Sequence, residues 1–219
     1  MSGSLNQGKH LDAAWLTDKD NFETMKNHLA QYFGGSIGGG ANFSGRFFEL
    51  FVGMSAPERF TAFDVLAAES LSVNVPRDVA HWLVRPDPDR DDLLWECLRN
   101  FSDGITLWDC APELLAVDGH LSRLYLKLKD QRGLGKVTTS KLLATKFPNV
   151  VPIRDSLVEQ VLGWADQSAW WMPMRNLTLS GVHEVVSNLP LPDGAPAVTT
   201  LRKLDVVLWM EARSRGFKA

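Results

Sequence analysis

Apolar residues recur at intervals of three and four along most of the chain, which is the spacing of one face of an α-helix. Alternating apolar and polar runs, the pattern of a half-buried strand, are sparse. Seven apolar stripes have the helical spacing, and they lie within residues 60–67, 91–101, 121–128, 142–143, 157–162, 182–189 and 201–208. The pattern predicts an all-α protein of roughly eight to ten short helices.

Turn-forming residues indicate where these helices begin and end. Residues 55–58, Ser-Ala-Pro-Glu, have the form of a capping box with a proline in the first turn, which predicts a helix start there. Prolines predict turns at 85–90 and 190–196. Segment 34–45 is rich in glycine but lacks the Lys-Ser/Thr end of a P-loop, so we expect a flexible loop rather than a nucleotide site.

Composition narrows the class of protein. The chain has 219 residues, of which 45% are hydrophobic and 22% charged, an ordinary mix for a globular protein. No apolar run reaches the ~18 residues of a membrane span, and the polar N-terminus lacks the apolar stretch of a signal peptide. Two cysteines, Cys97 and Cys110, cannot form a disulfide framework or a four-thiolate metal site. We therefore expect a cytoplasmic protein with reduced thiols, and the five scattered histidines form no zinc motif.

Charge is distributed unevenly along the chain. The total of 23 basic and 26 acidic residues disfavours a protein that coats nucleic acid over its whole surface. Residues 57–118 hold 13 acidic and 5 basic residues, a net −8, whereas residues 120–155 hold 8 basic and 2 acidic residues, a net +6. The basic segment suits an anionic partner that touches one face, although an ordinary solvated helix face has the same pattern.

Residues 120–147 combine two predicted helices with a tight turn, Gly133-Leu134-Gly135. Glycines let the chain turn at positive φ and let its backbone approach a ligand closely. The first N–H groups of the second helix, together with the helix dipole, form an anion site suited to a DNA phosphate. Such contacts position a duplex without reading its sequence. The candidate DNA-binding residues are Gly133, Gly135, Lys136, Val137, Thr138, Thr139 and Lys141.

This block resembles the helix-hairpin-helix of the DNA glycosylase superfamily that includes the endonuclease III, adenine-mismatch and alkylbase glycosylases. In that superfamily an aspartate follows the hairpin at a fixed interval, and here Asp155 follows Val137 by 18 residues within Pro-Ile-Arg-Asp-Ser-Leu-Val, residues 152–158. The chain also resembles an uncharacterised bacterial family related to these enzymes, through the runs at 141–144, 151–153 and 204–209. The superfamily resemblance is tight over about 40 residues and architectural elsewhere.

The resemblance implies that Asp155 is catalytic. Cleavage of a glycosidic bond in DNA needs the base out of the stack and negative charge near C1′ as cationic character develops. Superfamily members that also cut the strand form a Schiff base with a lysine, whose equivalent here is Val137, so the resemblance implies a monofunctional enzyme that uses water. We expect Lys141, one turn further on, to contact a phosphate or to be a solvated charge. Taken alone, Asp155 could simply be a helix N-cap.

The residues leave the base pocket and the cofactors largely open. Trp170, Trp171, Tyr32 and Arg46 are candidates for the pocket, because aromatic faces stack on bases, although such tryptophans are commonly core residues. Some superfamily members carry a C-terminal four-cysteine iron–sulfur cluster, but no cysteine follows Cys110. We expect no cofactor other than a monovalent cation, which superfamily hairpins often hold through backbone carbonyls.

The resemblance also implies two α-helical subdomains with a cleft between them. One would comprise residues 57–163, with the hairpin at 120–147, and the other residues 1–56 plus 164–219. The expected protein is a monomeric DNA glycosylase that removes a damaged, mismatched or modified base from double-stranded DNA, as in base excision repair. Two alternatives stay open: a non-catalytic helix-hairpin-helix module that binds DNA, and a helical interaction protein that has lost DNA binding.

Overall fold

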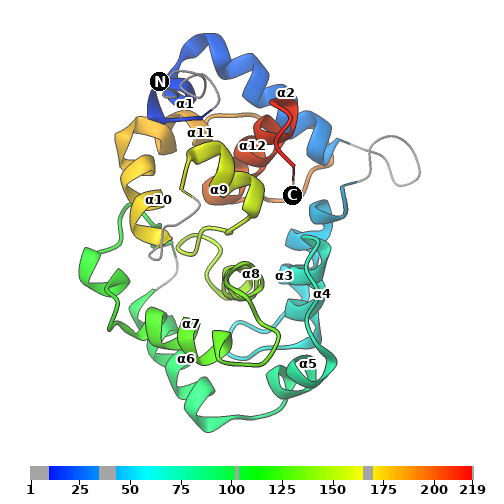
Figure 1. Ribbon diagram of the computed structural model, residues 1–219, viewed down its shortest axis with the longest axis vertical. Coiled ribbons are helices and arrows are strands. Elements are labelled where there is room, and N and C mark those ends of the chain that lie inside the picture. Colours follow the sequence, from blue (N-terminus) through cyan, green and yellow to red (C-terminus); the bar gives the residue numbers. More distant parts are fainter. Residues whose placement is uncertain (1–9, 35–42, 102–103, 165–169, 219) are drawn as a thin grey trace, which may run out of the picture. The chain divides into compact units, whose positions relative to one another are not determined.

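The computed structural model describes residues 10–34, 43–101, 104–164 and 170–218, and every regular element among them is helical, which confirms the all-α prediction. The chain forms two compact units (Figure 1). Met1–Asn42 and Arg154–Ala219 make the terminal unit, and Phe43–Ile153 makes the central unit. The predicted divisions lay after residues 56 and 163, whereas the units divide after residues 42 and 153. In the described ranges, no helix is both long and apolar enough to cross a membrane.

The central unit is organised around its last helix. α8 is enclosed by its neighbours, which include α4 and α7, and every residue from Thr138 to Lys146 is buried. Figure 1 shows α8 nearly end-on among the other helices of this unit. The described elements of the central unit are η2 (Ser44–Phe47), α3 (Phe48–Met54), α4 (Ala62–Ser70), α5 (Arg77–Val84), α6 (Pro88–Asn100), η3 (Pro112–Leu115), α7 (His120–Lys129) and α8 (Lys136–Lys146).

The capping box of α4 lies six residues later than the sequence pattern predicts. The Thr61 hydroxyl accepts a hydrogen bond from the Phe63 N–H at 3.2 Å, and the Asp64 carboxylate accepts one from the Thr61 N–H at 2.7 Å. Residues 55–58 form a turn instead of a helix start. The predicted apolar stripe is also shifted, because α4 buries Asp64 and leaves Phe63 and Leu66 exposed by 37% and 43%.

The terminal unit is organised around α12, which packs against α2 and α9. Val206, Val207 and Leu208 of α12 are fully buried. The Thr199 hydroxyl caps the start of this helix by accepting a hydrogen bond from the Arg202 N–H at 3.1 Å. The described elements of the terminal unit are α1 (Ala13–Thr17), η1 (Lys19–Asn21), α2 (Phe22–Phe33), α9 (Ser156–Leu162), α10 (Trp171–Leu177), η4 (Thr178–Val182), α11 (His183–Ser187) and α12 (Thr200–Ser214).

Candidate functional site

A compact turn at residues 130–135 joins α7 to α8 in the central unit. The Gln131 N–H donates to the Leu128 carbonyl at 3.0 Å, and the Leu134 N–H donates to the Gln131 carbonyl at 3.0 Å. The Leu134 side chain is buried and anchors the turn. These contacts fix the position at which α8 begins, so the turn holds the start of that helix in one conformation.

The two glycines of this turn, Gly133 and Gly135, differ in backbone conformation and in the space around them. Gly133 has φ of +90°, and a Cβ there would lie 2.7 Å from Cγ of Pro76, so the fold requires glycine. Gly135 has φ of −87°, which any residue can adopt, and a Cβ there would meet no atom within 4 Å. Gly135 is also exposed. Its missing side chain leaves the backbone at the start of α8 open to close approach from outside.

The structure divides the other candidate residues of α8 into an accessible beginning and a buried remainder. Lys136 and Val137 are half-buried at the start of the helix. Thr138 and Thr139 are only 8% and 0% exposed, because α8 is enclosed by its neighbours. The sequence predicts that these threonine side chains contact DNA, and their burial shows that this prediction is wrong. The backbone at the start of α8 and the Lys136 side chain remain as candidate DNA-binding groups.

Lys141 has an internal role in place of the predicted phosphate contact. Its side chain is 2% exposed, and its Nζ donates a hydrogen bond to the carbonyl of Leu71 at 2.8 Å. Leu71 is the C-cap of α4, whose last carbonyl groups lack partners within the helix. Lys141 therefore ties the end of α4 to α8, and its ammonium is not presented to a duplex.

The net +6 of residues 120–155 exceeds the charge at the surface of this segment. Of its eight cations, Lys141, Lys146 and Arg154 are buried. Lys146 pairs with Asp64 at 2.8 Å, and Arg154 pairs with Glu159. Five cations remain exposed or half-buried, and they are Arg123, Lys127, Lys129, Arg132 and Lys136. All five lie on α7, in the turn or at the start of α8, so the surface charge is concentrated around the hairpin.

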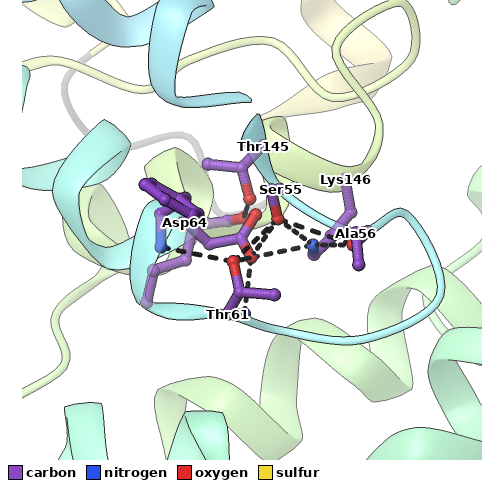
Figure 2. Close-up of polar contacts among 8 residues, drawn as sticks. Ser55, Ala56, Thr61, Asp64, Thr145 and Lys146 are labelled. Carbon is purple, nitrogen blue, oxygen red and sulfur yellow. Dashed lines mark hydrogen bonds and ion pairs between the residues drawn. The ribbon is translucent and has the colours of Figure 1, made fainter. Parts of the chain in front are cut away.

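A buried polar network fastens the end of α8 to the start of α4 (Figure 2). The Lys146 ammonium donates to the Ser55 hydroxyl at 2.9 Å and to the Ala56 carbonyl at 2.7 Å, and it pairs with Asp64. The same Asp64 oxygen accepts hydrogen bonds from the Ser55 and Thr61 hydroxyls. Burial lowers the pKa of Lys146, and the Asp64 carboxylate opposes this fall. The network fixes the position of α8.

Asp155 caps α9 in the terminal unit, as the sequence predicts. One carboxylate oxygen accepts a hydrogen bond from the Leu157 N–H at 3.0 Å, and the side chain is half-buried. Asp155 follows residues 152–154, which belong to no helix. Because the Leu157 N–H holds the carboxylate from one side, its position is well defined at the start of the helix.

The residues beside Asp155 are packed into an ion-paired, aromatic cluster. Arg154 pairs with Glu159, and its guanidinium carbon lies 5.3 Å from the centroid of the Trp170 ring. Trp170 also packs edge-on against Trp164, with 5.9 Å between ring centroids. Trp170 and Trp171 are 3% and 8% exposed, so both lie in the core of the terminal unit. The structure therefore favours the core interpretation of these tryptophans over open pocket walls.

The remaining pocket candidates belong to different units. Tyr32 is buried in the terminal unit, where its hydroxyl accepts a hydrogen bond from Arg202 at 2.9 Å. Arg46 is half-buried in the central unit, with its guanidinium carbon 5.0 Å from the centroid of the Phe47 ring. Most of the glycine-rich segment between them, residues 35–42, lies outside the described residues.

The monovalent cation that the resemblance implies would be held by backbone carbonyls of the hairpin, and two of these carbonyls already accept a hydrogen bond. The Leu128 and Gln131 carbonyls each accept a hydrogen bond within the turn. In the described part of the chain, no group of three or more His, Cys, Asp or Glu side chains could hold a metal ion.

Sequence reasoning missed the contribution of the segment between α4 and α5. Pro76 lies against Gly133, and the Leu71 carbonyl accepts the hydrogen bond from Lys141. Pro76 and Gly133 are about 57 residues apart in the sequence, and no motif at residues 71–77 indicates their contact. Gly133 was the available signal, because a glycine in a turn indicates either positive φ or a close neighbour.

Comparison with known proteins gives one match. The sequence model described as "Family of unknown function (DUF6308)" matches residues 25–212. The match spans most of both units, including the hairpin, Asp155 and α12. The comparisons with curated proteins and with solved structures give no match.

Proposed function

The chain belongs to the DUF6308 family of unknown function, and we propose that it is a monofunctional DNA glycosylase. In this proposal the start of α8 binds a backbone phosphate of duplex DNA, and Asp155 assists water in cleaving the bond between a flipped base and its sugar. The resemblance in the hairpin and the interval from Val137 to Asp155 motivate the proposal, and the geometry of the hairpin supports its DNA-binding part.

The observation that carries the proposal is the open backbone at Gly135. Nothing among the described residues requires glycine there, since φ is −87° and a Cβ would meet no atom within 4 Å. Gly135 is the N-cap of this 11-residue helix, where glycine is favoured over alanine, and its missing side chain also leaves the first N–H groups open to a ligand that approaches the backbone closely. The helix dipole makes that ligand an anion.

The surface charge around the hairpin supports a polyanion as the ligand. Arg123, Lys129 and Arg132 are exposed, and Lys136 is half-buried beside Gly135. Lys127 is held by Asp89 at 3.3 Å, so its charge is partly compensated. Several cations around one helix start can neutralise consecutive phosphates, which is how proteins hold a duplex without reading its sequence.

The chemistry assigned to Asp155 requires a fixed carboxylate and a water molecule. The C1′–N bond breaks and its electron pair leaves with the base, which takes up a proton from solvent water. The water oxygen bonds to C1′, and its released proton passes to the Asp155 carboxylate. The same negative charge stabilises the cationic sugar in the transition state. The hydrogen bond from the Leu157 N–H supports this assignment, because it orients the carboxylate in advance.

The second candidate is a DNA-binding module without catalysis, and burial of the tryptophans favours it. Trp170 and Trp171 are 3% and 8% exposed and so offer no open stacking face to a flipped base. In that case the hairpin still binds duplex DNA, whereas Asp155 acts only as the N-cap of α9.

Gly135→Ala tests the observation directly, with Gly53→Ala as the matched control. A Cβ at Gly53, in α3, also meets nothing within 4 Å. Both substitutions should change the free energy of unfolding by less than about 1 kcal/mol. Binding to a fluorescent duplex should weaken at least about tenfold in Gly135→Ala alone, because hydrogen bonds to a charged group contribute about 1.5–3 kcal/mol each.

The proposal predicts that this loss is the same for every duplex sequence, since a phosphate contact carries no sequence information. Lys136→Glu should weaken binding further and reduce its dependence on salt. Equal affinities of wild type, Gly135→Ala and Gly53→Ala would contradict binding at the start of α8.

A further inference from the structure

Three contacts, all within the central unit, fix the end of α4 and the segment that follows it, and one of them lies at the hairpin turn. The Lys141 ammonium donates to the Leu71 carbonyl at 2.8 Å. The Glu69 carboxylate accepts a hydrogen bond from the Val75 N–H at 3.1 Å. Pro76 lies against Gly133, with its Cγ 2.7 Å from the position of a Cβ. Residues 72–77, which we call the α4–α5 segment and which include the first residue of α5, are therefore fixed beside the turn that precedes α8.

The α4–α5 segment is exposed even though it is firmly held. Ser72, Asn74 and Arg77 are all exposed. Ser72 has φ of +63° and is the one non-glycine residue with positive φ in the described ranges. Such a conformation is unfavourable for serine and persists only where the surroundings impose it. The three contacts thus present a polar loop in a single conformation next to the hairpin.

Arg77 adds a cation to this side of the hairpin. It follows Pro76 directly, and Arg132 directly precedes Gly133, so two exposed guanidinium groups lie on chain segments that meet at the contact between Pro76 and Gly133. Residues 57–118 are otherwise acidic, with 13 acidic and 5 basic residues. Of those five, Arg90 is buried and Arg99 pairs with Glu96. Arg77 is therefore an exposed cation on a chain segment that meets the hairpin turn, which carries Arg132.

We propose that the α4–α5 segment is a second DNA-contacting element and that Arg77 binds a backbone phosphate next to the one held at Gly135. The proposal rests on the proposed binding of duplex DNA at the hairpin. Arginine suits this role because its planar guanidinium can bind a phosphate through two N–H groups. Lys141 is then a positioning residue, since it fixes the segment from inside through the Leu71 carbonyl.

The test compares Arg77→Ala with Arg85→Ala, since the two exposed arginines lie at opposite ends of α5. Affinity for a fluorescent duplex is measured from 50 to 400 mM KCl. Arg77→Ala should lower the slope of log affinity against log salt by about 0.9, which corresponds to about eightfold weaker binding at 100 mM. Arg85→Ala should bind like wild type. Asp78→Asn, next to Arg77, should bind more tightly because it removes a repelling carboxylate.

A cross-linking measurement tests the same contact without changing a charge. Cys97 and Cys110 are 0% and 1% exposed, so a cysteine introduced at exposed Asn74 reacts selectively with a photo-activated label. The control is Val117→Cys, at an 80% exposed position just before the start of α7. The label at position 74 should cross-link the duplex efficiently, and the label at position 117 should not.

The outcomes separate this inference from the proposed function. Suppose that Gly135→Ala weakens binding while Arg77→Ala keeps the wild-type affinity and salt slope. The proposed contact at Arg77 is then wrong, and the proposed binding at the hairpin is supported. The same holds if labels at 74 and 117 cross-link equally. If wild type binds no duplex at 50 mM KCl, both are wrong. The inference is supported if Arg77→Ala binds DNA more weakly and with a lower salt slope than wild type, whereas Arg85→Ala does not.

Discussion

At the scale of single residues, the hairpin shows that one residue type can be present for opposite reasons. Gly133 is needed by the fold, because of its φ of +90° and the contact with Pro76. Gly135 is not required sterically, because its φ is ordinary and the space around it is open, although glycine also suits its place as the N-cap of α8. The sequence contains both glycines but does not distinguish them. The distinction matters because only the second glycine points to a ligand.

Lys141 and Val137 together predict that no covalent intermediate forms with DNA. Valine has no nucleophile, and Lys141 is buried with its ammonium donating to the Leu71 carbonyl. Borohydride reduction during reaction with a cleaved substrate should therefore trap no protein–DNA adduct. A strong adduct that disappears in Lys141→Ala would show that this lysine leaves its buried position and acts as the nucleophile.

Glu211 predicts how stability depends on pH. Hydrogen bonds with His28 at 2.7 Å and Arg215 at 2.8 Å hold the pKa of Glu211 at about 2, below its ordinary 4.5, although burial opposes this shift. A carboxylate with a lowered pKa stabilises the fold above pH 4.5, and this contribution is lost as the pH falls toward 2.

Glu211→Gln should therefore lower the free energy of unfolding by up to about 3 kcal/mol at pH 7. Urea denaturation should show the gap between variant and wild type narrowing below pH 4.5. Glu184→Gln is the control, because Glu184 is exposed. A gap for Glu211→Gln that stays constant down to pH 3 would show that the carboxylate charge is not the cause.

At the scale of elements, α8 is the part of the fold that the sequence describes least well. Its polar residues suggest a solvated or DNA-facing helix, yet Thr139, Lys141 and Lys146 are all buried. Buried polar groups are tolerated where hydrogen bonds satisfy them, and here the partners of the lysines come from α4 and the turn before it. These partners lie about 70–90 residues away, so no local pattern reveals them.

The pair of Lys146 and Asp64 predicts a strong coupling between α8 and α4. Both side chains are almost fully buried, at 1% and 0% exposure, with 2.8 Å between Nζ and Oδ2. Lys146→Met should cost about 3–5 kcal/mol, because it leaves a buried carboxylate without its cation. Asp64→Asn in the same chain should recover much of that loss, since both charges are then absent and the amide can still accept the capping bond.

The measurement is a double-mutant cycle. The free energy of unfolding is determined by thermal or urea denaturation for the wild type, both single variants and the double variant. The interaction between the two substitutions should be at least about 1 kcal/mol. Simple addition of the two single effects would show that Lys146 and Asp64 stabilise the fold independently of each other.

At the scale of the whole molecule, local signals in the sequence predict more than its long-range contacts. The helical class, α6, α7, α9 and α12 follow from apolar spacing and caps, and the N-cap role of Asp155 follows from its context. α5 is short, and Pro76, which precedes it, makes a long-range contact with Gly133 in the hairpin turn. The capping box of α4 could not be placed from sequence, because Ser55 and Thr61 both fit the pattern and the buried Lys146 bonds decide between them.

Burial reduces the charge that the basic segment, residues 120–155, presents at its surface. Residues 120–155 carry a net +6, but two of the three buried cations are neutralised by Asp64 and Glu159 and the third binds a carbonyl. The exposed or half-buried cations of the segment are thus the five around the hairpin, of which Lys127 pairs with Asp89. The proposed DNA contact is correspondingly local, and it does not depend on a basic surface over the whole molecule.

Base release by wild type and Asp155→Asn tests the central claim most directly. Duplexes that carry deaminated, oxidised, alkylated or mismatched bases are treated with excess protein and then with alkali, which cleaves the strand wherever a base has been lost. Asn and Asp cap helices about equally well, so the variant should lose no more than about 1 kcal/mol of stability and should keep its affinity for DNA. Wild type should release at least one kind of base, and the variant should do so about 10²–10⁴-fold more slowly. Full base release by Asp155→Asn, or no release from any duplex by wild type, would contradict the glycosylase mechanism.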